Sequence, residues 1–249
     1  MKMKKEWDTM TNSFDTFAED YDEDIYPMGE PEFILPTVAA LEKLAPGKDI
    51  LAFAVGTGRI AIPLAQKGFK VSGIDISEEM LKVMANKKDG HLVESFVGDM
   101  STIALNRTFD LVYNIMNGIT YLLTLDEQVA FFKNAAKHLK PGCVLVLETF
   151  LPRLDRIVKD DVAPYALEET YIGFDKFDQN KQLLTSYQFD LSGEKVDSFQ
   201  TKHRYVWPSE LELMGKLADM KVLYRYENWE GDPLTNESDN IVMVLQKEE

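Results

Sequence analysis

Between residues 49 and 150 the chain alternates short, continuous apolar runs with segments whose apolar residues recur at helical spacing. The apolar runs, which predict buried strands, cover residues 50–55, 69–74, 92–97, 109–115 and 144–150. The segments of helical spacing, which predict helices, cover residues 59–67, 78–86 and 126–139. Strands that are apolar throughout and separated by helices are typical of a parallel sheet covered on both faces. Because crossovers between parallel strands are right-handed, this segment predicts a doubly wound α/β fold.

The residues on either side of this segment follow other patterns. Residues 31–44 have helical spacing that ends at Gly47. After Leu151, three β-type segments joined by polar turns predict antiparallel hairpins, over residues 167–177, 182–191 and 196–207. A helix from Pro208 to Ala218 and two strands then return to the main sheet, the strands at 222–227 and 241–245.

The predicted fold is therefore a mostly parallel, doubly wound sheet of seven strands, with an antiparallel β insertion after the fifth strand. The predicted parts are an N-terminal segment over residues 1–45, an α/β domain made of residues 46–150 and 207–249, and the insertion at 151–206. Insertions at the carboxyl ends of such strands build the substrate side of the pocket. For most of the insertion's aromatic residues, packing within the hairpins is the favoured role over lining that pocket.

Charge and composition narrow the classes of partner. The chain has 249 residues, with 27 Lys+Arg against 42 Asp+Glu, and a net charge of −15. This excess repels phosphate backbones and anionic lipid, so we expect neither a nucleic acid nor a membrane as partner. The single cysteine, Cys143, excludes an intramolecular disulfide and a cysteine-rich metal site. With no apolar run long enough to cross a bilayer and no signal-peptide core, we expect a cytoplasmic protein of undetermined oligomeric state.

Three of the predicted strands end in residues suited to hold a nucleoside. The first leads into Gly56-Thr57-Gly58, where backbone amides can approach a ligand because glycine has no Cβ. The second ends at Asp75, a carboxylate that can accept hydrogen bonds from both ribose hydroxyls. The third ends at Asp99, which can accept from an adenine amino group, while Ile76 and Met100 can cover the faces of the base. Each feature alone is also explained by an ordinary strand-to-helix turn or a capping aspartate.

Taken together, these residues resemble the motifs of the class I S-adenosylmethionine-dependent methyltransferases, which have a Rossmann-like fold. The first motif is matched by LAFAVGTG at residues 51–58, and the second by Asp75, Ser77, Met80 and Leu81. Gly98-Asp99, FDLV at 109–112 and LKPG at 139–142 match three further motifs. The resemblance covers residues 45–150 closely and residues 10–30 and 205–249 more loosely. The chain departs from the family at Ala52, where an acidic residue is usual.

The resemblance implies S-adenosylmethionine as the cofactor, S-adenosylhomocysteine as the product, and methyl transfer to an N or O atom of a small molecule. It makes residues 1–45 a helical lid over the cofactor-binding domain. Cofactor contacts are then expected from the glycines and acids above and from the following residues: Tyr21, Ala54, Gly56, Gly58, Arg59, Met80, Gly98 and Asn114. Tyr26 and Asn117 are expected to face the substrate.

Two features of the substrate side remain open in the sequence. His203, at the end of the insertion, is the best-placed general base if the insertion covers the site. The run Glu19, Asp20, Asp22, Glu23, Asp24 lacks the spacing of a calcium loop and predicts a solvated acidic face, which favours a cationic substrate such as an amine. With no His/Cys cluster, no metal site is expected.

Two alternative functions use the same residues. The motif GTGRIA at 56–61, with Asp75, also fits an NAD(P)-dependent oxidoreductase. The departure at Ala52 fits a module that binds S-adenosylmethionine without catalysis.

Overall fold

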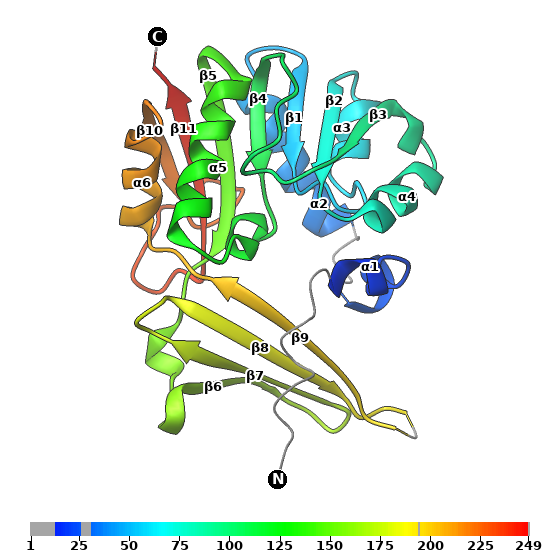
Figure 1. The fold of residues 1–249 in the computed structure, drawn as a ribbon, viewed down its shortest axis with the longest axis vertical. Coiled ribbons are helices and arrows are strands. Elements are labelled where there is room, and N and C mark those ends of the chain that lie inside the picture. Colours follow the sequence, from blue (N-terminus) through cyan, green and yellow to red (C-terminus); the bar gives the residue numbers. More distant parts are fainter. Residues whose placement is uncertain (1–12, 26–30, 194, 249) are drawn as a thin grey trace.

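The computed structural model describes residues 13–25, 31–193 and 195–248, and its main body is a seven-stranded sheet (Figure 1). The strand order across the sheet is β10-β11-β5-β4-β1-β2-β3. The strands are β1 (Asp49–Phe53), β2 (Lys70–Asp75), β3 (Val93–Val97), β4 (Phe109–Asn114), β5 (Leu139–Phe150), β10 (Met220–Tyr226) and β11 (Asn240–Lys247). β1 to β5 pair in parallel, while β11 is antiparallel to β5 and β10. The doubly wound, mostly parallel sheet that the sequence predicts is confirmed.

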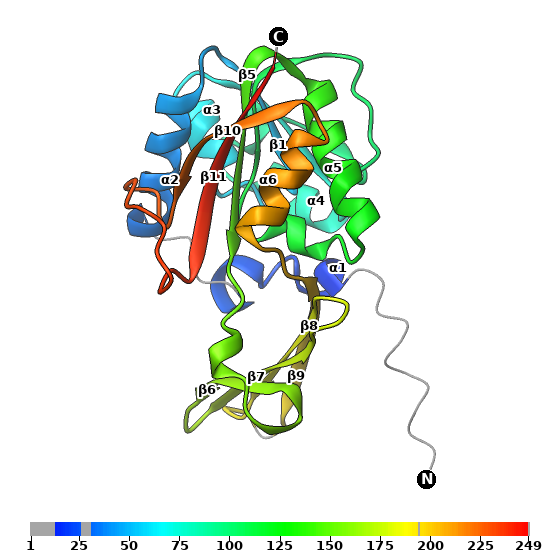
Figure 2. The same cartoon turned by 90° about the vertical axis from the view of Figure 1, so that its left-hand side faces the viewer.

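The central strands are mostly buried because helices cover both faces of the sheet. The helices are α1 (Ser13–Phe17), α2 (Pro31–Leu44), α3 (Ala61–Gln66), α4 (Glu78–Asn86), α5 (Leu125–His138) and α6 (Pro208–Lys216). Figures 1 and 2 show α2 and α3 on one face and α5 and α6 on the other. The side chains of residues 50–53 in β1 alternate between these two layers and are all fully buried. The core therefore consists of two apolar layers, one on each face of the sheet.

Local signals place the helix starts. Ser77 caps α4 by accepting a hydrogen bond from the Met80 amide at 3.1 Å. Thr124 and Glu127 cap α5 reciprocally, each side chain bonding the backbone N–H of the other. These helix starts fix the loops that join them to the carboxyl ends of β2 and β4.

The insertion forms a second, four-stranded antiparallel sheet with the order β6-β7-β8-β9. Its strands are β6 (Val162–Leu167), β7 (Tyr171–Asp178), β8 (Leu183–Asp190) and β9 (Asp197–Arg204). The sequence predicts only three of them. β6 escapes the prediction because Pro164 interrupts it, and proline is tolerated there because β6 is an edge strand.

The second sheet and residues 13–25 lie at the end of the large sheet where β5 leads into the insertion (Figures 1 and 2). The rings of Phe17 and Phe199 meet there, with centroids 4.6 Å apart. Within the described residues no helix combines the length and apolarity needed to cross a bilayer. The cytoplasmic location and the boundaries of the lid stay predictions.

Candidate active site

A cavity of about 260 Å³ lies at the carboxyl ends of the central parallel strands. Residues from the ends of β1, β2, β3 and β4 form its wall, and Phe14 and Tyr21 of the N-terminal segment contribute as well. The predicted cofactor residues that line it are Tyr21, Ala54, Gly56, Arg59, Asp75, Ile76, Met80, Gly98, Asp99 and Met100. These residues meet because the carboxyl ends of parallel strands share one edge of the sheet. Their contacts with a cofactor stay predictions.

The glycine turn after β1 exposes its backbone to this cavity. Ala54, Gly56 and Gly58 all have positive φ, at 55°, 57° and 78°. No atom lies within 4 Å of the position that a Cβ on Gly56 would take, whereas a Cβ on Gly58 would lie 2.6 Å from Met84 Cγ. Gly56 therefore leaves free space on the cavity side, while Gly58 allows close packing against α4 and does not line the cavity.

Asp75 connects the glycine turn to the start of α4. Its Oδ2 accepts a hydrogen bond from the Gly56 amide at 2.7 Å, and its Oδ1 accepts one from the Ser77 amide at 2.9 Å. A carboxylate has about four acceptor positions, so two remain for a ligand. Burial raises the pKa of Asp75, and the backbone N–H groups of Ser77 and Gly56 act in the opposite direction. These contacts fix the carboxylate at the cavity wall.

Asp99 lies on the same wall, after β3. Its Oδ1 accepts hydrogen bonds from both the amide and the hydroxyl of Ser101 at 2.7 Å, so Oδ2 is available to the cavity. Met100 beside it is buried, and Ile76 is 53% exposed. This end of the cavity thus offers a fixed acceptor between apolar side chains, as an adenine ring requires.

Residues 13–25 are held beside the cavity by Asp22. Its carboxylate accepts from the Thr57 hydroxyl at 2.7 Å, forms an ion pair with Arg59 Nε at 3.2 Å and also contacts Lys87. The Arg59 guanidinium in turn lies 4.8 Å from the ring centre of Tyr21. The prediction of a solvated acidic face is therefore wrong for Asp22, which is half-buried in these contacts. Nothing in the local sequence distinguishes Asp22 from its acidic neighbours.

Besides Gly58, three predicted site residues do not line this cavity, and one more lies outside the described part of the chain. Asn114 is fully buried, with its amide nitrogen donating to the Phe53 carbonyl at 3.1 Å. Asn117 has a positive φ of 67°, and its Oδ1 accepts from the Phe150 amide at 2.7 Å. Tyr26 lies outside the described residues.

His203, the third, is fixed inside the protein. Its Nδ1 lies 2.8 Å from the Thr120 hydroxyl and its Nε2 lies 2.8 Å from the Thr201 hydroxyl, and its ring packs on Tyr121. Burial lowers the pKa of His203 to about 4. Because both ring nitrogens are engaged and the ring does not line the cavity, the geometry does not support a role as general base. His203 instead ties β9 to the loop after β4.

A second cavity, of about 270 Å³, adjoins the first. The two share a wall made by Tyr21, Arg59, Met116 and Tyr121. The rest of the second cavity is formed by α2, the end of β5 and the loop between β10 and β11. These elements contribute Glu32, Glu148, Glu227, Trp229 and Glu230. Asn117, predicted to face the substrate, also lies on its wall. Among the described residues no group of three or more His, Cys, Asp or Glu is arranged to hold a metal.

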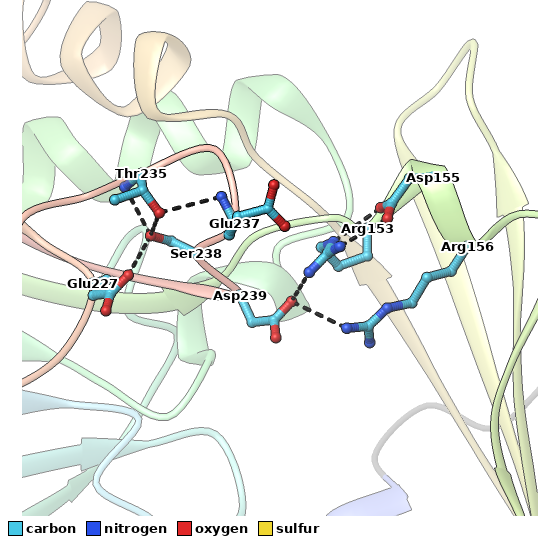
Figure 3. A network of polar contacts seen from close by, with 8 residues as sticks. All are labelled: Arg153, Asp155, Arg156, Glu227, Thr235, Glu237, Ser238 and Asp239. Atoms are coloured by element: carbon cyan, nitrogen blue, oxygen red, sulfur yellow. Dashed lines mark hydrogen bonds and ion pairs between the residues drawn. The ribbon is translucent and has the colours of Figure 1, made fainter.

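The loop between β10 and β11 is fixed by the network of Figure 3. The Ser238 hydroxyl donates to the Glu227 carboxylate at 2.6 Å, which closes the loop on itself. At its far end Asp239 forms ion pairs with Arg153 at 2.8 Å and Arg156 at 3.5 Å, both from the segment after β5. These contacts therefore hold the loop, and the side chains that it brings to the second cavity, in a fixed position.

Comparison with known proteins relates this geometry to a family. Residues 50–142 match the family described as "Methyltransferase domain". The chain is 24% identical over 206 residues to the cypemycin N-terminal methyltransferase of a Streptomyces species, which covers 81% of this chain and 84% of the relative. It is 30% identical over 99 residues to dTDP-3-amino-3,4,6-trideoxy-alpha-D-glucopyranose N,N-dimethyltransferase of Streptomyces venezuelae, covering 40% of this chain and 41% of the relative.

The fold has a solved counterpart as well. The structure of the CcbJ methyltransferase from Streptomyces caelestis superimposes with a TM-score of 0.82 and 28% identity, covering 94% of this chain and 96% of that chain. The GTGRIA motif at 56–61 lies inside the segment matched by the methyltransferase family. The oxidoreductase alternative therefore loses its main support.

Proposed function

Because the chain belongs to the class I S-adenosylmethionine-dependent methyltransferases, we propose that it methylates an N or O atom of a small-molecule acceptor. The observation that carries the proposal is the convergence of Gly56, Asp75 and Asp99 on one cavity. A nitrogen acceptor is favoured, because the cypemycin enzyme is named as an N-terminal methyltransferase and the amino-sugar enzyme as an N,N-dimethyltransferase.

The cavity has the groups that S-adenosylmethionine requires. The two free acceptor positions of Asp75 suit the ribose hydroxyls, and the free oxygen of Asp99 suits the adenine amino group. The open space beside Gly56 would be filled by any larger residue, so it suits close approach of the ligand to the backbone. We assign the methionine end to Arg59 and Tyr21, which line the same cavity and contact each other.

The chain's contribution to the chemistry is mainly alignment. Bound S-adenosylmethionine supplies a methyl group on a sulfonium, which is a good leaving group. The residues of the cavity wall hold the donor at a fixed position, and the N-terminal segment, held by Asp22, covers it from water. Fixing donor and acceptor at near-attack distance removes much of the entropic part of the barrier.

The test is transfer of a labelled methyl group. The protein is incubated with S-adenosylmethionine carrying a CD₃ group and a small-molecule cell extract, and products are found by mass spectrometry. We expect labelled small molecules with the wild-type protein and far fewer with Asp75→Ala. Cofactor binding without any labelled product would favour the non-catalytic alternative and refute the proposal.

A further inference from the structure

The second cavity is the part of the structure that the cofactor does not account for. It shares Tyr21, Arg59, Met116 and Tyr121 with the cofactor cavity, so a molecule bound in it lies against the donor. A methyl acceptor must reach near-attack distance from the donated methyl group. A cavity that shares a wall with the donor site meets this requirement.

Glu148, at the carboxyl end of β5, has unused hydrogen-bonding capacity in this cavity. Its Oε2 accepts from the Met116 amide at 2.9 Å and its Oε1 accepts from the Trp229 indole N–H at 3.2 Å. Each oxygen retains one acceptor position. Among the described residues no lysine or arginine forms an ion pair with Glu148. A carboxylate that accepts only two hydrogen bonds and has no cationic partner is costly to bury unless a ligand supplies a further donor.

The other charged groups on the cavity wall are also mostly negative. Glu32 comes from α2, and Glu227 and Glu230 come from the loop between β10 and β11. Among the described residues of the wall the only cation is Arg59, and it is paired with Asp22 at 3.2 Å. The Trp229 and Phe33 rings add apolar surface. A cavity of this sign attracts cations and repels carboxylates and phosphates.

We propose that this cavity binds the acceptor as an amine whose reacting nitrogen donates a hydrogen bond to the Glu148 carboxylate, and that Glu148 removes a proton from that nitrogen. This inference rests on the proposed function and specifies its substrate class and base. The acceptor ammonium gives one proton to the Glu148 carboxylate, which frees the nitrogen lone pair. That lone pair forms the N–C bond to the methyl group while the S–C electron pair stays on sulfur. The proton on Glu148 then passes to water.

The state of Glu148 agrees with this role. Burial raises the pKa of Glu148, while its bonds from Met116 and Trp229 lower it. A base whose pKa is raised toward the working pH takes a proton more effectively than an ordinary glutamate.

The test compares three variants in the labelled-methyl assay. Glu148→Gln removes the charge, Glu148→Asp retains it, and Glu237→Gln makes the same charge change on an exposed part of the β10–β11 loop. We expect label on nitrogen, a loss of kcat/KM of about 100-fold or more in Glu148→Gln, partial activity in Glu148→Asp and no change in Glu237→Gln. The Kd for S-adenosylhomocysteine should stay within about twofold in all three, which shows that the fold and cofactor site are intact.

A second readout does not depend on turnover. The Trp229 indole N–H contacts Glu148 directly, so its NMR resonance, assigned with Trp229→Phe, reports the protonation of that carboxyl. We expect it to titrate in the wild type with a midpoint above the ordinary glutamate value of 4.5 and not to titrate in Glu148→Gln.

The outcomes separate the two proposals. Label on oxygen, an unimpaired Glu148→Gln variant, or a midpoint at or below 4.5 overturns the inference and leaves the methyltransferase function standing. If the wild-type protein labels no acceptor at all, the proposed function fails and the inference fails with it.

Discussion

Replacing Asp75 with alanine should weaken cofactor binding and loosen the glycine turn at the same time. The carboxylate accepts from Gly56 at 2.7 Å and Ser77 at 2.9 Å, and Asp75 lines the cavity. A hydrogen bond to a charged group contributes about 1.5–3 kcal/mol. Loss of the ribose contact should therefore raise the Kd for S-adenosylhomocysteine roughly 10- to 150-fold.

The effect on stability is separate from the effect on binding. Without Asp75 the amides of Gly56 and Ser77 lose their acceptor, and a buried donor without a partner costs about 1–3 kcal/mol. Urea unfolding of the ligand-free protein measures this cost, and calorimetric titration with S-adenosylhomocysteine measures the affinity. A folded Asp75→Ala protein with the wild-type Kd would show that the ribose does not bind here.

Glu78→Ala is the matched control for this experiment. Glu78 lies three residues further along, at the exposed start of α4, where it forms an ion pair with Lys82 at 3.6 Å. The substitution removes the same charge from the same region. Because exposed ion pairs contribute little, both stability and Kd should stay close to those of the wild type.

Three further predictions concern neighbouring residues. Asp99→Ala should reduce the preference for S-adenosylhomocysteine over its inosine analogue, because the lost acceptor pairs with the adenine amino group. Competitive binding measures the ratio of the two Kd values, and an unchanged ratio contradicts the assignment. Gly58→Ala should cost about 1–3 kcal/mol more unfolding free energy than Gly56→Ala, because only its Cβ would meet Met84; equal costs in urea unfolding would refute this packing. Burial lowers the pKa of His203 from 6.5 to about 4. As the pH falls through that interval the protein should lose up to about 3 kcal/mol of folding stability, because His203 takes up its proton first in the unfolded chain. His203→Gln should flatten this part of the stability profile, and an equal loss between pH 7 and pH 4 in both proteins would count against it.

Local sequence patterns predict most of the fold because its elements are marked locally. The continuous apolar runs of β1 and β4 require cover on both faces, and Ser77 and Thr124 mark where helices begin. The convergence of Gly56, Asp75 and Asp99 on one cavity also follows from the pattern, since each ends a parallel strand. β6 is the exception, because Pro164 hides an edge strand.

Contacts between distant segments could not be predicted in the same way. Asp22 meets Thr57 across 35 positions of sequence, and no periodicity connects the two. His203 is close in sequence to the site's expected border, but only the packing of β9 against Thr120 shows that its ring is enclosed. Glu148 is the one charged residue in the run at residues 144–150 that predicts the fifth strand, and this position was the available signal.

The most direct test of the account is calorimetric titration of the wild-type protein with S-adenosylhomocysteine. The cavity at Gly56, Asp75 and Asp99 predicts saturable binding at one site per chain. Absence of binding up to millimolar ligand by the folded protein would contradict the assignment of this cavity and the function built on it.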